Sequence, residues 1–112
     1  MEMARKARDN YERPSGYRKG VRDTVFGRAK GTHGKVRDPG TGKEIMPSEK
    51  WDMGHKPGHE FRKHQQNARD RGISRKEFLD EHNNPDIYRP ETPGTNRSGR
   101  FEDQTDTFLG GD

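Results

Sequence analysis

The chain has no cysteine and few hydrophobic residues. Of its 112 residues, 22% are hydrophobic and 38% are charged. Without cysteine, disulfide bonds and zinc sites built on thiolates are excluded. No apolar run approaches the roughly 20 residues that a membrane-spanning helix needs, and no signal peptide is visible. We therefore expect a soluble chain without a membrane partner, whose export would depend on something outside these residues.

Common catalytic patterns are missing as well. The chain has neither a Gly-x-Ser-x-Gly motif nor a cysteine nucleophile, so acyl-transfer chemistry has no basis here. His59 and His64 are five residues apart, whereas the zinc-protease helix needs histidines four apart so that both reach one metal ion. A spacing of five separates two side chains by roughly 140° around a helix. We therefore interpret His59 and His64 as structural residues.

The balance of charges favours a folded domain. The chain has 23 Lys and Arg against 19 Asp and Glu, a net charge of +4, whereas disordered chains typically combine low hydrophobicity with high net charge. The length allows one domain. We predict a small α+β domain with a thin core, stabilised by a metal ion, a partner or both. A partly disordered interaction segment is the alternative interpretation.

Basic residues gather at the N-terminus, where residues 1–30 contain nine Lys and Arg against four Asp and Glu. We expect residues 1–16 to form a flexible basic arm and residues 17–112 to form the domain. Such an arm is usually a solvated surface, although Tyr11 and Tyr17 leave contact with nucleic-acid phosphates open. Next in the chain, the spacing of its valines predicts a short helix over residues 20–26.

Two elements of the central region have clear local signals. Residues 34–46 have the pattern of a β-hairpin around a Pro-Gly-Thr-Gly turn. The Gly-x-Gly in that turn follows no long buried strand and opens no helix, so we do not interpret it as a nucleotide-binding loop. Residues 60–71 contain neither glycine nor proline, and they predict a helix that ends at Gly72.

The last third of the chain predicts three short elements. Ser74 and Glu77 form a capping box that begins a second helix. A short strand is predicted over residues 87–89, before Pro90. A final helical turn is predicted over residues 95–98.

The densest group of chemically active residues is the run from Trp51 to Glu60. A Pro-Gly pair interrupts it, so the backbone must turn there, between a short strand ending near His55 and a helix beginning near Glu60. A histidine at such a turn can take a proton from water near neutral pH, as phosphodiester hydrolysis requires. A nearby carboxylate can hold a divalent ion against a phosphate oxygen. The alternative is a turn histidine with a structural hydrogen bond.

The segment WDMGHKPG at residues 51–58 resembles the signature of the GH-E nucleases. This family belongs to the HNH/endonuclease VII superfamily and occurs as C-terminal toxin domains of bacterial polymorphic toxins such as Rhs proteins. The resemblance covers roughly residues 17–103. It continues in YRKGVR from residue 17, VRDP from residue 36, KHQQ from residue 63, GISR from residue 72, YRPE from residue 88 and NRS from residue 96.

The resemblance implies a ββα-metal nuclease core with extra short helices. His55 matches the general-base histidine at the end of the first strand, and Asn96 matches the superfamily asparagine at the start of a short helix. The acids available to bind or orient an ion are Asp52, Glu60, Glu91 and Glu102. The predicted site therefore has His55, Glu60 and Asn96 as catalytic residues, Asp52, Asn96 and Glu102 as metal ligands, and Lys56, Arg97 and Arg100 as nucleic-acid contacts.

One position departs from the family pattern. The resemblance leads us to expect a histidine after the Asn-Arg-Ser segment, and this chain has Gly99 there. Three interpretations follow: the ligand is dispensable, Glu102 replaces it, or its loss weakens activity.

The resemblance implies a metal-dependent DNase that hydrolyses phosphodiester bonds in the DNA of competing bacteria. Such a toxin would be secreted or delivered as an effector that acts in the cytoplasm of the target cell. The implied cofactor is a divalent ion, Mg²⁺, Mn²⁺ or Zn²⁺, and the implied partners are DNA and a cognate immunity protein. The alternative is a nucleic-acid-binding module without enzymatic activity. The residues themselves do not distinguish DNA from RNA, because both present the same phosphodiester.

Overall fold

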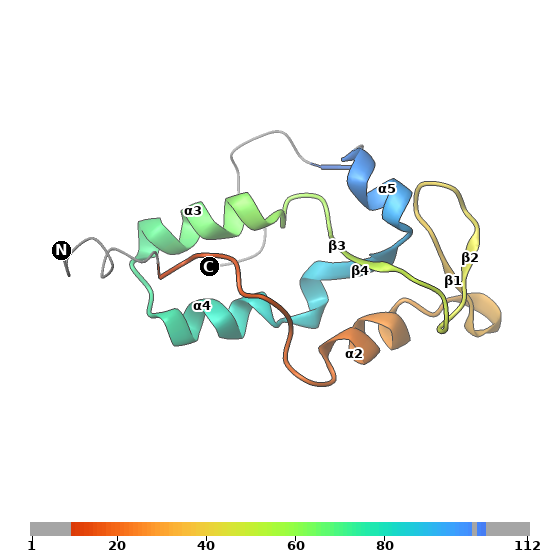
Figure 1. Ribbon diagram of the computed structural model, residues 1–112, viewed down its shortest axis with the longest axis horizontal. Helices are drawn as coiled ribbons and strands as arrows, with labels where there is room; N and C mark the ends of the chain where they lie inside the picture. The colour runs from red at the N-terminus through yellow and green to blue at the C-terminus, as the bar shows by residue number, and fades with distance from the viewer. Residues whose placement is uncertain (1–9, 100, 103–112) are drawn as a thin grey trace.

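The computed structural model describes residues 10–99 and 101–102. Figure 1 shows α3 and α4 side by side at one end of the molecule, and α2 with the β1–β2 hairpin at the other. The architecture is α+β, as predicted. In chain order the elements are α2 (Val21–Arg28), the 3-10 helix η1 (Thr32–Gly34), β1 (Val36–Arg37), β2 (Glu44–Ile45), β3 (Asp52–His55), α3 (Phe61–Arg71), α4 (Arg75–His82), the 3-10 helix η2 (Pro85–Ile87), β4 (Tyr88–Glu91) and α5 (Pro93–Ser98).

The main core lies between α2, the β1–β2 hairpin and the β3–β4 sheet. Its buried side chains are Val25, Phe26, Val36, Ile45, Trp51, Met53, Ile87 and Tyr88. Strands β1 and β2 pair antiparallel, with Val36 opposite Ile45, and both of these side chains are buried. The predicted hairpin and the helix before it are thus confirmed, and burial of their few apolar residues is the main force that holds them together.

Strands β3 and β4 form the second antiparallel sheet. Asp52 lies opposite Glu91, and His55 lies opposite Tyr88. Because successive side chains of a strand point to opposite faces, His55 and Asp52 project from different faces of this sheet. Asp52 and His55 therefore leave β3 in different directions.

Strand β4 corrects the prediction of a strand over residues 87–89. The strand runs from Tyr88 through Pro90 to Glu91, while Ile87 ends the 3-10 helix η2. Each strand of a two-stranded sheet has an outer edge, so a proline can be accommodated where its missing N–H would have faced outward. The sequence rule that proline ends a strand fails here because the sheet is so small.

A smaller group of aromatic side chains lies between α3 and α4. Phe78 of α4 is fully buried, and its ring meets the rings of Phe61 and His64 from α3. The ends of both helices follow the predicted signals. Gly72 caps α3 with a φ of 64°, and Ser74 and the glutamate three residues later form the capping box at the start of α4, worth about 1 kcal/mol.

The last helix begins earlier than predicted. We expected a turn over residues 95–98, and α5 spans Pro93–Ser98. The hydroxyl of Thr92 accepts a hydrogen bond from the N–H of Thr95, so Thr92 is the N-cap and Pro93 occupies the first turn. Threonine followed by proline is a helix-start signal that the prediction did not use.

Residues 10–16 lie against α3 and α4, seen in red in Figure 1. The division of the chain at residue 16 stays a prediction. In the part of the chain that the structure describes, no helix has both the length and the apolar character that crossing a membrane requires.

Candidate active site

A tight turn joins β3 to α3 and borders the site. The N–H of His59 donates to the carbonyl of Lys56 at 2.9 Å. Pro57 and Gly58 are the central residues, and Gly58 has a φ of 89°. Proline followed by a glycine of positive φ is the pattern of a type II turn. The strand–turn–helix order predicted for this segment is confirmed.

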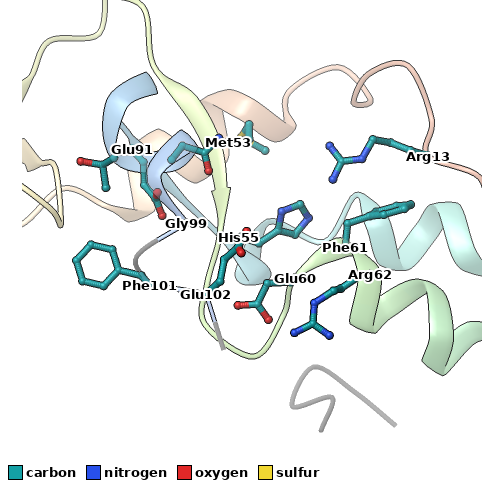
Figure 2. A pocket seen from close by; sticks show the side chains of 12 residues that line it. Arg13, Met53, His55, Glu60, Phe61, Arg62, Glu91, Gly99, Phe101 and Glu102 are labelled. Atoms are coloured by element: carbon teal, nitrogen blue, oxygen red, sulfur yellow. The ribbon is translucent and has the colours of Figure 1, made fainter. Parts of the chain in front are cut away.

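A pocket of about 400 Å³ opens beside the turn (Figure 2). Four of the predicted site residues line it: His55 at the end of β3, Glu60 before α3, Asn96 in α5 and Glu102 after it. Glu91 of β4, one of the acids available to bind an ion, lines the pocket as well. Segments far apart in the sequence thus bring an imidazole, an amide and three carboxylates to one cavity.

His55 lies among aromatic and positively charged side chains. Its ring centroid is 4.7 Å from that of Tyr88, and Figure 2 shows the imidazole directed toward Arg13 and Phe61. Burial lowers the pKa of His55 to about 3, and the positive charge of Arg13 acts in the same direction. The imidazole is therefore neutral at pH 7, so one of its nitrogens is able to accept a proton.

Glu60 is held at the floor of the pocket by its own turn. Its side chain is only 6% exposed, and its two oxygens lie 3.1 and 3.3 Å from the backbone nitrogen of Gly58, which donates to them. The buried ammonium of Lys63 lies 4.0 Å from Oε1. Buried charges need such partners, because an isolated carboxylate out of water is strongly unfavourable.

A second polar group lies where β3, β4 and α5 meet, and two of its members, Glu91 and Asn96, line the same pocket as His55. The side-chain amide of Asn96 donates to Oδ2 of Asp52 at 3.1 Å. Glu91, opposite Asp52 in the sheet, is 4% exposed and accepts a hydrogen bond from Nε of Arg89 at 2.9 Å. Asp52, predicted as a metal ligand, therefore meets the pocket through Asn96 rather than by lining it.

Gly54 makes room for the buried Glu91 carboxylate. A Cβ at position 54 would stand 2.4 Å from the carboxyl carbon and from Oε2 of Glu91, a distance that no side chain tolerates. Only glycine therefore allows Glu91 to lie across β3. This explains, in physical terms, the glycine that precedes His55.

Helix α5, which supplies Asn96, is anchored by a buried carboxylate from the hairpin. Asp38 is 1% exposed and accepts hydrogen bonds from the hydroxyl of Thr95 (2.7 Å), the N–H of Thr92 (2.8 Å) and both the N–H and the hydroxyl of Thr41 (2.9 Å each). Burial raises the pKa of Asp38, but these hydrogen bonds outweigh it and bring the pKa to about 2. The anchor is thus fully charged at neutral pH.

Glu102 stands against the position where a histidine was expected. Gly99 ends α5 with a φ of 66°, in the left-handed region that favours glycine. A Cβ there would lie 3.3 Å from Oε2 of Glu102. A side chain at position 99 would therefore be in tight contact with the carboxylate of Glu102, which would have to shift slightly to admit it.

Two of the three predicted nucleic-acid contacts lie away from the pocket lining. Among the described residues, Lys56 and Arg97 are exposed and neither borders the cavity, whereas Arg13 and Arg62 do. Arg100 lies outside the described residues. For Arg62 the sequence offered one signal, because it lies two positions after Glu60. For Arg13 it offered none, because only the tertiary structure brings residues 10–16 to the site.

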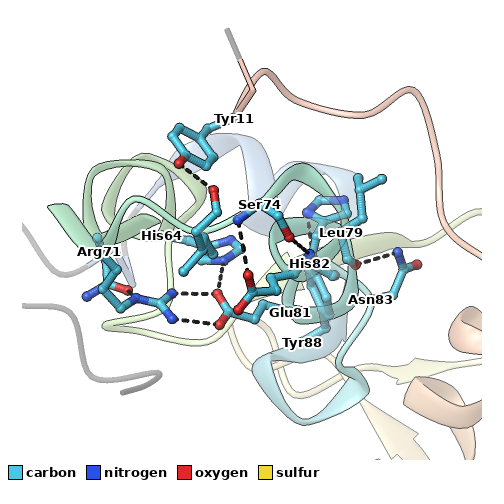
Figure 3. A network of polar contacts seen from close by, with 12 residues as sticks. Tyr11, His64, Arg71, Ser74, Leu79, Glu81, His82, Asn83 and Tyr88 are labelled. Atoms are coloured by element: carbon cyan, nitrogen blue, oxygen red, sulfur yellow. Dashed lines mark hydrogen bonds and ion pairs between the residues drawn. The ribbon is translucent and has the colours of Figure 1, made fainter. Parts of the chain in front are cut away.

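His64 of α3 and His82 at the end of α4 do not line the pocket. They belong to the network of polar contacts drawn in Figure 3. Nε2 of His64 is 2.8 Å from Oε1 of Glu81, which also forms a two-armed ion pair with Arg71. His64 stacks on the ring of Phe78. The structural interpretation of His64 therefore holds, and no zinc-protease arrangement is formed.

The donor set fits a hard divalent ion. In residues 10–99 and 101–102, no three His, Asp or Glu side chains gather closely enough to hold a metal by themselves. Asp52, Glu91 and Asn96 nevertheless place two carboxylates and an amide where β3, β4 and α5 meet. Magnesium binds proteins through one or two carboxylates and completes its shell with water and substrate phosphates. The residues present suit that mode better than a preformed zinc site, which uses nitrogen and sulfur ligands.

The fold and the pocket together define the class of protein to which this chain belongs. A two-stranded antiparallel sheet followed by a short helix, with an imidazole at the end of one strand, is the arrangement of an HNH-type nuclease core. Residues 33–102 match the family model GH-E, described as "HNH/ENDO VII superfamily nuclease with conserved GHE residues". The match covers more than half of the chain, and the chain belongs to this family of nucleases. No solved structure matches it.

Proposed function

We propose that this chain is a metal-dependent endonuclease that hydrolyses DNA, with His55 as its general base. The observation that carries the proposal is the pocket itself. It gathers an imidazole, an amide and carboxylates within the residues that match a nuclease family.

The surroundings of His55 suit the role of a base that becomes stronger when substrate binds. Without substrate the ring is neutral, because burial and the charge of Arg13 hold its pKa at about 3. A phosphodiester entering the pocket brings negative charge beside the ring, and a nearby opposite charge favours the protonated form. His55 is thereby placed to take a proton from the attacking water at the moment when the phosphate is present.

Glu60, Asn96 and their partners organise the rest of the site. Asp52, Glu91 and Asn96 would hold a divalent ion, with Glu102 replacing the expected histidine as a further oxygen donor. When bound, that ion supplies charge neutralisation at the phosphate and at the departing oxygen. HNH/ENDO VII nucleases generally use such an ion. Glu60, fixed by the N–H of Gly58, presents its carboxylate beside His55 and orients the water.

Plasmid cleavage tests this proposal. Supercoiled plasmid is incubated with the full chain and Mg²⁺, Mn²⁺ or Zn²⁺ after removal of bound metal with EDTA, with single-stranded RNA in a parallel reaction. The wild type should nick the plasmid, and His55→Ala should leave it intact. His59→Ala is the matched control, because His59 is also a histidine that follows a glycine and lies only four residues from His55. The His59→Ala variant should retain most of the activity.

Each outcome has a defined meaning. Equal cleavage by wild type and His55→Ala would refute the role of His55. DNA binding without cleavage under any of the three ions would favour the alternative, a binding module without enzymatic activity. Cleavage of RNA but not of plasmid would keep the nuclease and reject DNA as its substrate.

We also propose that the chain acts as a toxin domain delivered into the cytoplasm of competing bacteria. This rests on the resemblance to toxin-borne nucleases, and a cognate immunity protein follows from the danger to the producing cell. An acidic protein is the simplest partner for a chain of net charge +4. Expression in the cytoplasm of a bacterial host should reduce viability, and His55→Ala should not. Co-expression of the neighbouring gene product should restore growth and co-purify with the chain, and failure of both would reject that partner.

A further inference from the structure

An arginine from outside the family-matched residues reaches the candidate active site. Arg13 lies in the segment at residues 10–16, and its side chain lines the same pocket as His55 and Asn96. Figure 2 shows its guanidinium extending from one side of the pocket toward the imidazole of His55. The segment that carries it precedes the match at residues 33–102.

The backbone immediately before Arg13 is fixed by contacts with the α3–α4 region. The hydroxyl of Tyr11 donates to the carbonyl of Ile73 at 2.6 Å, and its ring packs edge-on against a buried phenylalanine of α4. The guanidinium of Arg75 donates to the carbonyls of Asn10 (2.7 Å) and Glu12 (2.8 Å). These contacts tie the segment to the helices that frame the site.

Local sequence adds to this restriction. Arg13 precedes Pro14, and a residue before proline is confined to extended conformations. The exposed Arg13 side chain then lies over the ring of Phe61, with Cζ 4.5 Å from the ring centroid. A planar guanidinium stacked on an aromatic ring loses less conformational freedom when it binds an anion. The group is therefore held ready for a ligand.

The charges around Arg13 indicate what that ligand is. Within the described residues its guanidinium forms no ion pair with a carboxylate. It faces a neutral imidazole, and its charge opposes protonation of that ring. An anion bound between the Arg13 guanidinium and the His55 imidazole would pair with the guanidinium and offset its effect on the ring. Arginine forms two parallel hydrogen bonds with phosphate oxygens, which suits a phosphodiester particularly well.

We propose that Arg13 is a phosphate-binding residue of the nuclease site, and that its guanidinium binds a non-bridging oxygen of the nucleic-acid backbone beside His55. The proposal rests on the proposed function and extends the site to the segment at residues 10–16. The ligand class is a nucleic-acid phosphodiester, held without regard to base sequence.

Binding of DNA without metal tests Arg13 separately from catalysis. The fluorescence anisotropy of a labelled duplex is measured in EDTA with wild type, Arg13→Gln, Arg13→Lys and Lys30→Gln, over a range of salt concentrations. Lys30 is exposed and does not line the pocket, so Lys30→Gln removes the same charge elsewhere. Far-UV circular dichroism of each variant confirms that the fold is retained.

Arg13→Gln should weaken duplex binding by about tenfold, as expected for loss of a charge-assisted hydrogen bond. It should also reduce the slope of log K against log salt by about 1. Arg13→Lys should recover part of the affinity, and Lys30→Gln should bind nearly as wild type does. With Mn²⁺ added, Arg13→Gln should need more plasmid to reach half-maximal nicking.

Two failures are distinguishable. If the wild type neither binds nor cleaves nucleic acid, the proposed function itself is wrong. If the wild type binds and cleaves while Arg13→Gln matches Lys30→Gln in affinity and salt slope, the nuclease stands and the role of Arg13 is overturned. Loss of the circular dichroism signal in Arg13→Gln together with full activity of Arg13→Lys would assign Arg13 to folding instead.

Discussion

The hydroxyl of Thr95 donates a 2.7 Å hydrogen bond to Oδ2 of Asp38 and thereby joins α5 to the β1–β2 hairpin. Thr95 is the residue before Asn96, so this bond sets the position of the amide at the site. The hairpin has no side chain in the pocket itself. Its contribution is to hold the short helix that does.

Replacing Asp38 should therefore destabilise the fold in a pH-dependent way. The folded-state pKa of about 2 lies below the ordinary value of 3.8, so the charged Asp38 contributes about 2 kcal/mol at neutral pH. That contribution is present above about pH 4 and is lost as the pH falls toward 2. In urea unfolding at pH 7, Asp38→Asn should lower the free energy of unfolding by about 2 kcal/mol or more, because its amide meets four donors.

The same measurement on Asp23→Asn provides the control, since Asp23 is exposed and its change should be within about 0.5 kcal/mol. A difference between wild type and Asp38→Asn that does not shrink between pH 5 and pH 3 would contradict the proposed anchor.

The contact between Gly54 and Glu91 should be visible in a double-mutant cycle. Gly54→Ala places a methyl group 2.4 Å from the Glu91 carboxylate and should cost about 1–3 kcal/mol of stability. In a Glu91→Ala background the obstacle is gone, so the second substitution should cost much less. Gly27→Ala in α2, where a Cβ meets nothing within 4 Å, should instead stabilise the chain by about 1 kcal/mol. Additive effects at 54 and 91 would show that the two residues do not compete for this space.

Acid should weaken the fold well above the range in which carboxylates titrate. His82 is 2% exposed, and burial, together with the charges of His64, Arg13 and Arg75, lowers its pKa to about 4. Between about pH 6.5 and pH 4 the unfolded chain binds a proton at this site that the folded chain does not. Stability should therefore fall by about 1.4 kcal/mol per pH unit for this residue.

Denaturant unfolding between pH 7.5 and pH 5 measures this slope. His82→Gln should have a shallower slope than wild type, whatever its absolute stability. The exposed His33 supplies the control variant His33→Gln, whose slope should match that of wild type. Identical slopes for His82→Gln and wild type would mean that His82 takes up its proton over the same pH range in the folded and the unfolded chain.

A histidine at position 99 should not improve the nuclease. Gly99 has a φ of 66°, where a side chain costs roughly 1–2 kcal/mol, and its Cβ would press on Glu102. Gly99→His should therefore cleave plasmid more slowly than wild type. Gly94→His in the same helix, where a Cβ meets nothing within 4 Å, should remain close to wild type. A severalfold gain of activity in Gly99→His would instead support a lost ligand that Glu102 does not replace.

Local signals predicted much of the fold. The capping box at Ser74, the stop at Gly72 and the Pro-Gly turn were all readable, because each depends on a few neighbouring residues. The two element boundaries that were predicted wrongly lie around Pro90 and Thr92. The strand was expected to end before Pro90, whereas the edge of a two-stranded sheet tolerates a proline. At the helix, the start signal given by Thr92 followed by Pro93 was not used.

The candidate site was predicted in part. His55 and Glu60 share one turn, so their proximity followed from the sequence, and the family resemblance added Asn96 and Glu102. The burial of Glu91 across Gly54 and the entry of Arg13 from the N-terminal segment left no local trace. Both depend on contacts between residues that are distant in sequence.

The sequence by itself determined the absence of thiol chemistry, the order of short elements, and the turn that places an imidazole beside a carboxylate. These properties follow from composition and from steric preferences that act over a few residues. Only the tertiary structure decided which face of the β3–β4 sheet each polar group occupies, and that the Asp38 carboxylate anchors α5. Register and packing set those positions, because the pairing of β3 with β4 and the burial of so small a core are properties of the whole chain.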